Sequence, residues 1–388
     1  MKEQNLLLVH GGAPTAVMNA SVYGVIKEAV QHGEIGHVYA AIGGSGAILK
    51  ERFRDLLQIP EEKKRCLLPV TPASVIGSSR DQLEQEDYKM IARILGKYKI
   101  RYVLFNGGNG SMDTCGKIYH ACRDEGLEIC VGGIPKTIDN DLAVTDHAPG
   151  YPSAARYIAS TTANIAEDVH ALPIHVSVVE AMGRNAGWIT AASVLARDKG
   201  YGPDLVYLPE RPFHEEEFLE DVQKCIDRNR CAVVVCSEGL RGDDGDPIVK
   251  PIYQTGRSVY YGDVSAHLAE LVIRRLGYKA RSEKPGIAGR AGIEYQSCVD
   301  REEAILAGQE AVRAVLQGDT GFMIGFRRAP GERYHVDPIR IPIEDVMMYE
   351  NKVPERFINA RGNGMNEAFC KWLSPLLGEP FEPFFRFD

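Results

Sequence analysis

Short apolar runs, each followed by a glycine-rich turn or by a stretch with helical spacing, constrain the fold of this 388-residue chain more than any other feature. Parallel strands that are buried on both faces typically have this pattern. Strands that alternate with helices indicate a doubly wound α/β fold, whose ligands bind at the carboxyl ends of the strands. The apolar runs are residues 6–9, 38–42, 102–105, 129–131, 176–179 and 232–236.

The length predicts two or three domains, because a domain typically has about 150 residues. A Pro-Gly-Tyr-Pro segment at 149–152 is the best candidate boundary, which gives domains 1–150 and 151–388. We therefore predict two doubly wound parallel-sheet domains, with the active site in the cleft between them and the C-terminal segment as a candidate to pack back on the first domain. Helices are expected at about 18–31, 112–123, 188–197, 214–228 and 265–276.

Charge and cysteine content exclude several classes of protein. The chain has 45 Lys and Arg against 53 Asp and Glu, so its net charge of −8 provides no basic field for nucleic acid or an anionic membrane. The sequence contains no run of 18 apolar residues, so it predicts no membrane span. The nine cysteines form neither a C-x-x-C pair nor a cluster with zinc spacing, so we expect a reduced, cytoplasmic protein.

The segment Gly107-Gly108-Asn109-Gly110-Ser111 follows one apolar run and precedes a predicted helix. Glycine-rich backbone at the start of a helix is suited to phosphate oxygens, although a simple tight turn would have the same composition. The spacing matches neither the P-loop motif nor the dinucleotide-binding motif. A phosphate site and a plain turn both remain possible for this segment alone.

The segment Pro135-Lys136-Thr137-Ile138-Asp139-Asn140-Asp141 is the sharpest candidate for catalysis. Two carboxylates beside a lysine and a threonine can provide a general base, a metal ligand and a phosphate contact within one loop. A solvated turn is the alternative, because Asn and Asp favour turns.

Basic side chains in the second half of the chain are further candidates for binding anions. Arg184 lies between an apolar run and a predicted helix, where a guanidinium can bind phosphate oxygens through two hydrogen bonds. A second group of basic residues can equally be a solvated surface, and it consists of Lys279, Arg281, Lys284 and Arg290.

In this order, the motifs resemble the phosphofructokinase family, whose members phosphorylate fructose 6-phosphate at its 1-hydroxyl with ATP or pyrophosphate. The resemblance spans roughly residues 5–295 and is most similar to the non-allosteric, pyrophosphate-using branch. It rests on segments 11–21, 77–80, 107–111, 135–141, 182–184 and 237–239.

The resemblance implies a role for each matching residue. Asp139 would take the proton from the sugar hydroxyl, with Thr137 and Asp141 beside it, and Arg80 and Arg184 would stabilise the transferring phosphoryl group. The first domain would bind the donor through Gly11, Gly12, Gly108, Asn109, Gly110, Ser111 and Lys136. The second would bind the sugar phosphate through Met182, Gly183, Arg184, Glu238, Arg281 and Arg290, with Thr137 and Asp139 also contacting the substrate. Mg²⁺ and a homo-oligomer, a dimer or a tetramer, are implied as well.

Two departures from the family pattern concern the donor and the metal. Family members that use pyrophosphate typically have Asp where Gly110 stands and Lys where Lys136 stands. A glycine removes the steric and charge obstacle to the α-phosphate of ATP, so we expect ATP as the donor, with pyrophosphate as the alternative. Asn109 is a weaker Mg²⁺ ligand than the usual Asp, and Asp139 is a further candidate ligand.

A third departure concerns the acceptor. Ile287 stands where the family normally has His or Tyr, and it cannot donate a hydrogen bond to a phosphate. The leading hypothesis is a 6-phosphofructokinase. The alternatives are the pyrophosphate-dependent enzyme, a kinase of another sugar phosphate, and a non-catalytic relative that binds sugar phosphate. A dinucleotide dehydrogenase is disfavoured because its glycine motif is missing.

Overall fold

The computed structural model describes residues 4–255, 258–331, 333–347 and 349–386. The chain forms two compact units. Unit 1 contains residues 1–153 and 290–351, and unit 2 contains residues 154–289 and 352–388. An internal segment therefore returns to unit 1 whereas the C-terminal residues belong to unit 2, so the continuous range 151–388 does not describe the second unit.

Unit 1 is built on a seven-stranded sheet in the order β13-β12-β5-β4-β1-β2-β3. Its inner strands are parallel, and the edge strands β3 and β13 run antiparallel to their neighbours. The strands are β1 (Gln4–His10), β2 (Ile35–Ala41), β3 (Phe53–Asp55), β4 (Ile100–Gly107), β5 (Cys130–Pro135), β12 (Phe322–Arg328) and β13 (Val336–Pro342). The helices are α1 (Met18–Ala29), α2 (Gly46–Leu49), α3 (Gln85–Lys97), α4 (Asn109–Asp124) and α10 (Cys298–Leu316).

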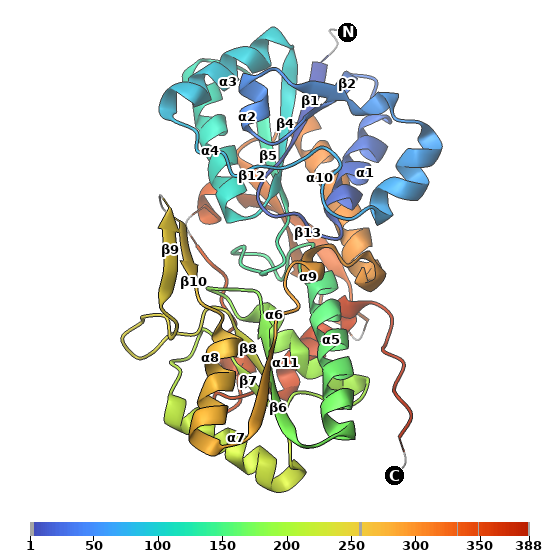
Figure 1. The fold of residues 1–388 in the computed structure, drawn as a ribbon. Helices are drawn as coiled ribbons and strands as arrows, with labels where there is room; N and C mark the ends of the chain where they lie inside the picture. Colours follow the sequence, from blue (N-terminus) through green and yellow to red (C-terminus); the bar gives the residue numbers. More distant parts are fainter. Residues whose placement is uncertain (1–3, 256–257, 332, 348, 387–388) are drawn as a thin grey trace. The chain divides into compact units, whose positions relative to one another are not determined.

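Helices cover both faces of this sheet (Figure 1). Alternate residues of β1 point to opposite sides, because successive side chains of a strand do so. Leu6 and Leu8 join the core cluster formed with α1 and α10, and Leu7 and Val9 join the cluster formed with α3 and α4. Both faces are buried, which explains why the strand reads as a continuous apolar run.

Unit 2 contains a four-stranded parallel sheet in the order β11-β6-β8-β7. Helix α5 covers one face, where Ala166 and Val169 pack on Val233, and helices α7 and α8 form the core on the other. The strands are β6 (His175–Ala181), β7 (Leu205–Tyr207), β8 (Ala232–Ser237) and β11 (Lys279–Glu283), with a separate hairpin of β9 (Pro251–Thr255) and β10 (Ser258–Tyr261). The helices are α5 (Tyr151–Ala171), α6 (Trp188–Ala192), α7 (Glu215–Asn229), α8 (Val264–Leu271), α9 (Ala288–Ala291) and α11 (Glu367–Leu373). The first three residues of α5 and the last two of α9 are counted in unit 1.

The predicted α/β class is confirmed for both units, since helices flank a largely parallel sheet in each. Two local predictions differ from the structure. The helix expected at 188–197 ends at Ala192 and continues as a tighter 3₁₀ segment to Asp198. The helix expected at 265–276 is an α-helix only to Leu271 and continues as a wider π-helical segment to Leu276, while Gly277 after it has φ 74°, the left-handed conformation expected of a glycine at a helix end. In the described part of the chain, no helix is both long enough and apolar enough to cross a membrane.

Candidate active site

A cavity of about 410 Å³ lies in unit 1 where β1, β4 and β5 end. We call it the donor pocket, after the donor-binding role predicted for residues in its wall. The loops after these strands meet there because the three strands are adjacent and parallel. The predicted site residues in its wall are Gly11, Gly12, Arg80, Gly108, Asn109, Gly110, Ser111, Lys136, Thr137, Asp139 and Asp141.

The glycine-rich segment predicted as a loop is shorter than expected. Strand β4 continues to Gly107 and helix α4 begins at Asn109, so only Gly108 separates them. The Gly108 carbonyl accepts hydrogen bonds from the backbone N–H groups of Ser111 and Met112 at 2.9 and 3.0 Å. The first turn of α4, including Asn109 and Gly110, therefore faces the donor pocket, and the positive end of a helix there favours an anion.

Gly11 and Gly12 line the donor pocket, but their backbone N–H groups are used within the protein. The Gly11 N–H donates to the carbonyl of Asn106 at 3.0 Å, and the Gly12 N–H donates to the carbonyl of Ser79 at 2.9 Å. These two N–H groups are therefore already bonded within the protein, and the donor-binding role expected of Gly11 and Gly12 stays a prediction. Gly11 also allows close packing, because a Cβ there would lie 2.2 Å from the Ser111 hydroxyl.

Lys136 is the most buried charged group of the donor pocket, with 4% of its surface exposed. Its ammonium donates to the carbonyl of Ala13 at 2.6 Å. Burial, with smaller contributions from Arg80 and Arg290, lowers the pKa of Lys136 to about 8, although Asp141 and Asp139 oppose the shift. An anionic ligand would stabilise the positive charge of this buried ammonium and reduce its repulsion from the nearby guanidinium groups.

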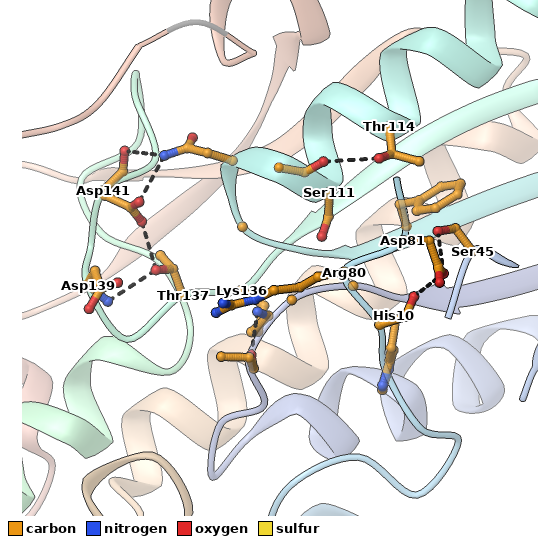
Figure 2. Close-up of a pocket in the computed structure, with 18 of the residues that line it drawn as sticks. His10, Ser45, Arg80, Asp81, Ser111, Thr114, Lys136, Thr137, Asp139 and Asp141 are labelled. Carbon is orange, nitrogen blue, oxygen red and sulfur yellow. Dashed lines mark hydrogen bonds between the residues drawn. The ribbon is translucent and has the colours of Figure 1, made fainter. Parts of the chain in front are cut away.

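Residues 137–141 follow this lysine in the predicted segment, and we call them the carboxylate loop (Figure 2). The Thr137 hydroxyl donates to Asp141 Oδ1 at 2.7 Å and accepts a hydrogen bond from the Asp139 backbone N–H at 3.1 Å. The Asn109 amide donates to Asp141 Oδ2 at 2.9 Å. Asp141 is thus held by two neighbours, and Thr137 fixes the backbone at Asp139.

One oxygen next to Asp141 is suited to binding a cation. Asn109 Oδ1 is buried and has no hydrogen-bond partner, while the Nδ2 atom of the same amide is bound to Asp141. Among the residues that the structure describes, no group of three or more His, Cys, Asp and Glu side chains is arranged to hold a metal. Mg²⁺ usually binds through one or two protein oxygens plus waters and substrate phosphates, so these residues are compatible with it.

Sequence analysis missed the polar group at the other end of the donor pocket. Asp81 Oδ2 accepts hydrogen bonds from the Gly46 N–H at 2.6 Å, the Ser45 hydroxyl at 3.1 Å and the Ser79 hydroxyl. Burial raises the pKa of Asp81, but these hydrogen bonds outweigh it and hold the pKa below its usual value. The only sequence signal was the position of Asp81 directly after Arg80. Figure 2 shows Ser45 and Asp81 on the opposite side of Lys136 from Asp139.

A second group of predicted residues meets within unit 2, after strands β6 and β8. Glu238 accepts a hydrogen bond from the Gly183 N–H at 3.2 Å, and the Ser237 hydroxyl donates to the Gly183 carbonyl at 2.8 Å. The Arg184 guanidinium lies 3.9 Å from the Glu238 carboxylate and 5.4 Å from the ring centroid of Tyr261. Half of the Arg184 side chain is exposed, so it remains accessible to a ligand.

The four basic residues of the 279–290 segment do not form a single cluster. Arg281 lies on β11 and lines a cavity of about 630 Å³ with Lys279 and His175. Lys284 pairs with Glu180 at 3.3 Å and with Asp263. Arg290 belongs to unit 1 and lies close enough to Lys136 to lower its pKa.

Comparisons with known proteins agree with this arrangement. The sequence model of the phosphofructokinase family matches residues 5–315. The pyrophosphate-fructose 6-phosphate 1-phosphotransferase of Rhodospirillum rubrum is 35% identical over 100% of this chain and 97% of its own length. The sulfofructose kinase of Alkalicoccus urumqiensis is 30% identical over 95% of this chain and 94% of its own length.

Among solved structures, the pyrophosphate-dependent phosphofructokinase of Nitrosospira multiformis superposes with a TM-score of 0.89 at 32% identity. The superposition covers 99% of this chain and 94% of that one. The predicted resemblance is confirmed, and the relatives favour the pyrophosphate alternative over the ATP hypothesis. The order of the motifs, the fold and the near-complete matches establish that the chain belongs to the phosphofructokinase family.

Proposed function

We propose that this chain transfers a phosphoryl group from pyrophosphate to the 1-hydroxyl of fructose 6-phosphate. The observation that carries the proposal is the near-complete match to the Rhodospirillum rubrum protein, which is named for this reaction. The chemistry of the donor pocket supports it, since a buried lysine and a helix N-terminus suit a compact anion.

Unit 1 would bind the donor and supply the base. The Lys136 ammonium and the first turn of α4 would bind the phosphates of the donor. Asp139 would accept the proton of the sugar hydroxyl as that oxygen attacks phosphorus, and Thr137 and Asp141 would keep its loop in place. Arg80 would stabilise negative charge on the transferring group, which is the main form of catalysis in phosphoryl transfer.

Unit 2 would hold the sugar phosphate. Glu238 offers a carboxylate that can accept hydrogen bonds from sugar hydroxyls, Met182 and Gly183 form the turn beside it, and the half-exposed Arg184 offers a guanidinium for phosphoryl oxygens. Arg281 is proposed to bind the 6-phosphate, and the same role is proposed for Arg290, which belongs to unit 1. Ile287 is 67% exposed and adds no polar contact to them.

Mg²⁺ fits the donor pocket as a cofactor. Asn109 Oδ1 and the Asp139 carboxylate would hold it together with the donor phosphates, and the ion would neutralise charge on phosphoryl oxygens.

A homo-oligomer is proposed from the family resemblance. All nine cysteines are free thiols, which supports a reducing, cytoplasmic location.

Two observations favour alternative substrates in the same reaction. A Cβ at Gly110 would meet no atom within 4 Å, so the space that an Asp would fill in a pyrophosphate enzyme is open, which favours ATP. The Alkalicoccus urumqiensis relative is named a sulfofructose kinase, and Ile287 removes a hydrogen-bond donor from the segment that would bind the 6-substituent. A sulfonate carries one negative charge and needs fewer donors than a phosphate.

The test is a set of initial rates with two donors and two acceptors. Pyrophosphate or ATP is supplied with fructose 6-phosphate or sulfofructose, always with Mg²⁺. We expect the highest kcat/KM for pyrophosphate with fructose 6-phosphate. A higher value with ATP would make the open space at Gly110 the decisive feature. A higher value with sulfofructose would reassign the acceptor, and no turnover in any combination would refute the proposed function.

A further inference from the structure

Two carboxylates of α10, Asp300 and Glu303, lie one helical turn apart and both contact the segment that follows residues 137–141, Asp300 through backbone N–H groups and Glu303 through the His147 side chain. Residues three apart share one face of a helix. Both side chains are buried, with 0% and 6% of their surface exposed, and α10 is distant from the loop in sequence. We call these two residues the α10 carboxylates.

Asp300 binds the end of the segment. Its Oδ1 accepts a hydrogen bond from the Gly150 N–H at 2.8 Å, and its Oδ2 accepts from the Ser153 N–H at 3.1 Å and from the Ser153 hydroxyl. Ser297 caps α10 by accepting from the Asp300 N–H at 3.3 Å. Burial raises the pKa of Asp300 to about 6, although the hydrogen bonds from Ser153 and Gly150 oppose the shift.

Glu303 binds the middle of the segment through His147, which is fully buried. His147 Nε2 lies 2.6 Å from Glu303 Oε2, and His147 Nδ1 lies 3.0 Å from Asp146 Oδ2. Arg328 pairs with Asp146 at 3.0 Å, and the Tyr334 hydroxyl donates to Glu303. Burial lowers the pKa of His147, but the Glu303 and Asp146 carboxylates outweigh it and raise the pKa to about 9.

The same segment holds the loop on both sides of Asp139. The Thr137 N–H donates to the carbonyl of Pro149 at 3.1 Å, and the Ala148 N–H donates to Asn140 Oδ1 at 3.0 Å. Asn140 has φ 52°, a left-handed conformation that costs free energy unless contacts maintain it. Residues 148–150 are therefore a physical link between the α10 carboxylates and the residues before and after Asp139.

We propose that the α10 carboxylates are positioning residues for Asp139, acting through His147 and the backbone of residues 148–150. The catalytic part of this inference rests on the proposed function, because it takes Asp139 as the base. The two carboxylates fix the segment at two points, so that residues 137–141 cannot rotate about a single contact. A reacting group that is misplaced by about 1 Å can lose roughly 100-fold in rate, so such rigidity affects turnover directly.

The first test compares two buried glutamates: Glu303, on α10 itself, and Glu28, on α1, whose carboxylate binds Arg313 of α10. Glu303→Gln keeps the shape of the side chain and removes the charge that binds His147. Glu28→Gln is the matched control, since Glu28 is 3% exposed and accepts hydrogen bonds from Arg313 at 2.7 and 2.8 Å, and no hydrogen bond or ion pair joins it to residues 137–153 within the described part of the chain. We expect Glu303→Gln to lower kcat about tenfold or more, with KM within about twofold for both substrates. Glu28→Gln should keep the wild-type kcat.

The second measurement is amide hydrogen exchange of peptides that cover residues 137–153, which does not depend on activity. Exchange should be faster in Glu303→Gln than in the wild type and Glu28→Gln, because the N–H groups of Thr137, Ala148 and Gly150 lose protection. If the wild type turns over no substrate pair, the proposed function fails, and exchange still tests the positioning role.

The inference is overturned if Glu303→Gln folds with wild-type kcat and wild-type exchange, or if Glu28→Gln loses the same activity. Should Glu303→Gln fail to fold, Tyr334→Phe replaces it, because that change removes only the hydroxyl that donates to Glu303. We expect Tyr334→Phe to lower kcat about threefold and to speed exchange in the same peptides. Wild-type values for both quantities would also overturn the inference.

Discussion

The lowered pKa of Lys136 leads to a prediction about the pH dependence of donor capture. Lys136 lines the donor pocket, is 4% exposed, and has a pKa of about 8 because burial disfavours its charge. Only the protonated ammonium can bind donor phosphates as a cation. Raising the pH above 8 should therefore lower kcat/KM for the donor, because this quantity reports ionisation of the free enzyme.

The size of the effect follows from this pKa. With a value of about 8, the protonated fraction of Lys136 falls from about 90% at pH 7 to about 9% at pH 9, a tenfold change. Lys136→Arg keeps a charge that does not titrate in this range. The ratio of kcat/KM for Lys136→Arg to that for the wild type should therefore rise about tenfold between pH 7 and pH 9, whatever the absolute activity of the variant.

The assay measures kcat/KM for pyrophosphate and for ATP at half-unit steps from pH 6.5 to 9.5, at saturating sugar phosphate and constant ionic strength. Ionisation of the donor itself is common to both proteins and cancels in the ratio. Lys136→Met serves as the uncharged control, and its kcat/KM should be low and should show no decrease with pH near pH 8. A ratio that stays constant across the range would refute the assignment of Lys136 as the titrating donor-binding group.

Three further changes test other parts of the structure. Asp139→Asn should lower kcat by about 100- to 10,000-fold with an unchanged unfolding midpoint, because an amide cannot accept the hydroxyl proton; near-normal turnover would remove Asp139 from the role of base. Gly110→Asp should reduce kcat/KM for ATP and spare that for pyrophosphate, because the new side chain would occupy the space that the α-phosphate of ATP needs. The variant should fold normally, because a Cβ at this position meets open space. Unchanged ATP kinetics would refute this steric argument. His147 has a folded pKa of about 9 against 6.5 unfolded, so its stabilisation is complete below pH 6.5 and is lost as the pH rises towards 9. Urea unfolding followed by circular dichroism measures the free energy of unfolding. Between pH 6.5 and 8 this free energy should fall by about 1.5 kcal/mol more for the wild type than for His147→Gln. The same pH dependence in both proteins would contradict the ion pairs of His147.

Much of the candidate site was predictable because its residues come in short segments whose chemistry is local. Lys136, Thr137, Asp139 and Asp141 lie within six consecutive residues, and the structure places all of them in the wall of one pocket. The position of that pocket at the ends of β1, β4 and β5 follows from the parallel pattern of the apolar runs. The donor is less predictable, because Gly110 and Lys136 point to different donors and the relatives, not the pocket, favour pyrophosphate.

The sequence by itself determined the α/β class, the order of the candidate site segments along the chain, and the group of polar residues at 135–141, because apolar periodicity and loop composition depend on near neighbours. Only the tertiary structure decided that the N–H groups of Gly11 and Gly12 are already bonded, and that residues 290–351 return to unit 1. It alone brought Glu303 to His147, 156 positions earlier in the chain. No local pattern reports such a pair, because its partners meet only when α10 packs against α1 and the sheet, and their burial then makes the charges depend on each other.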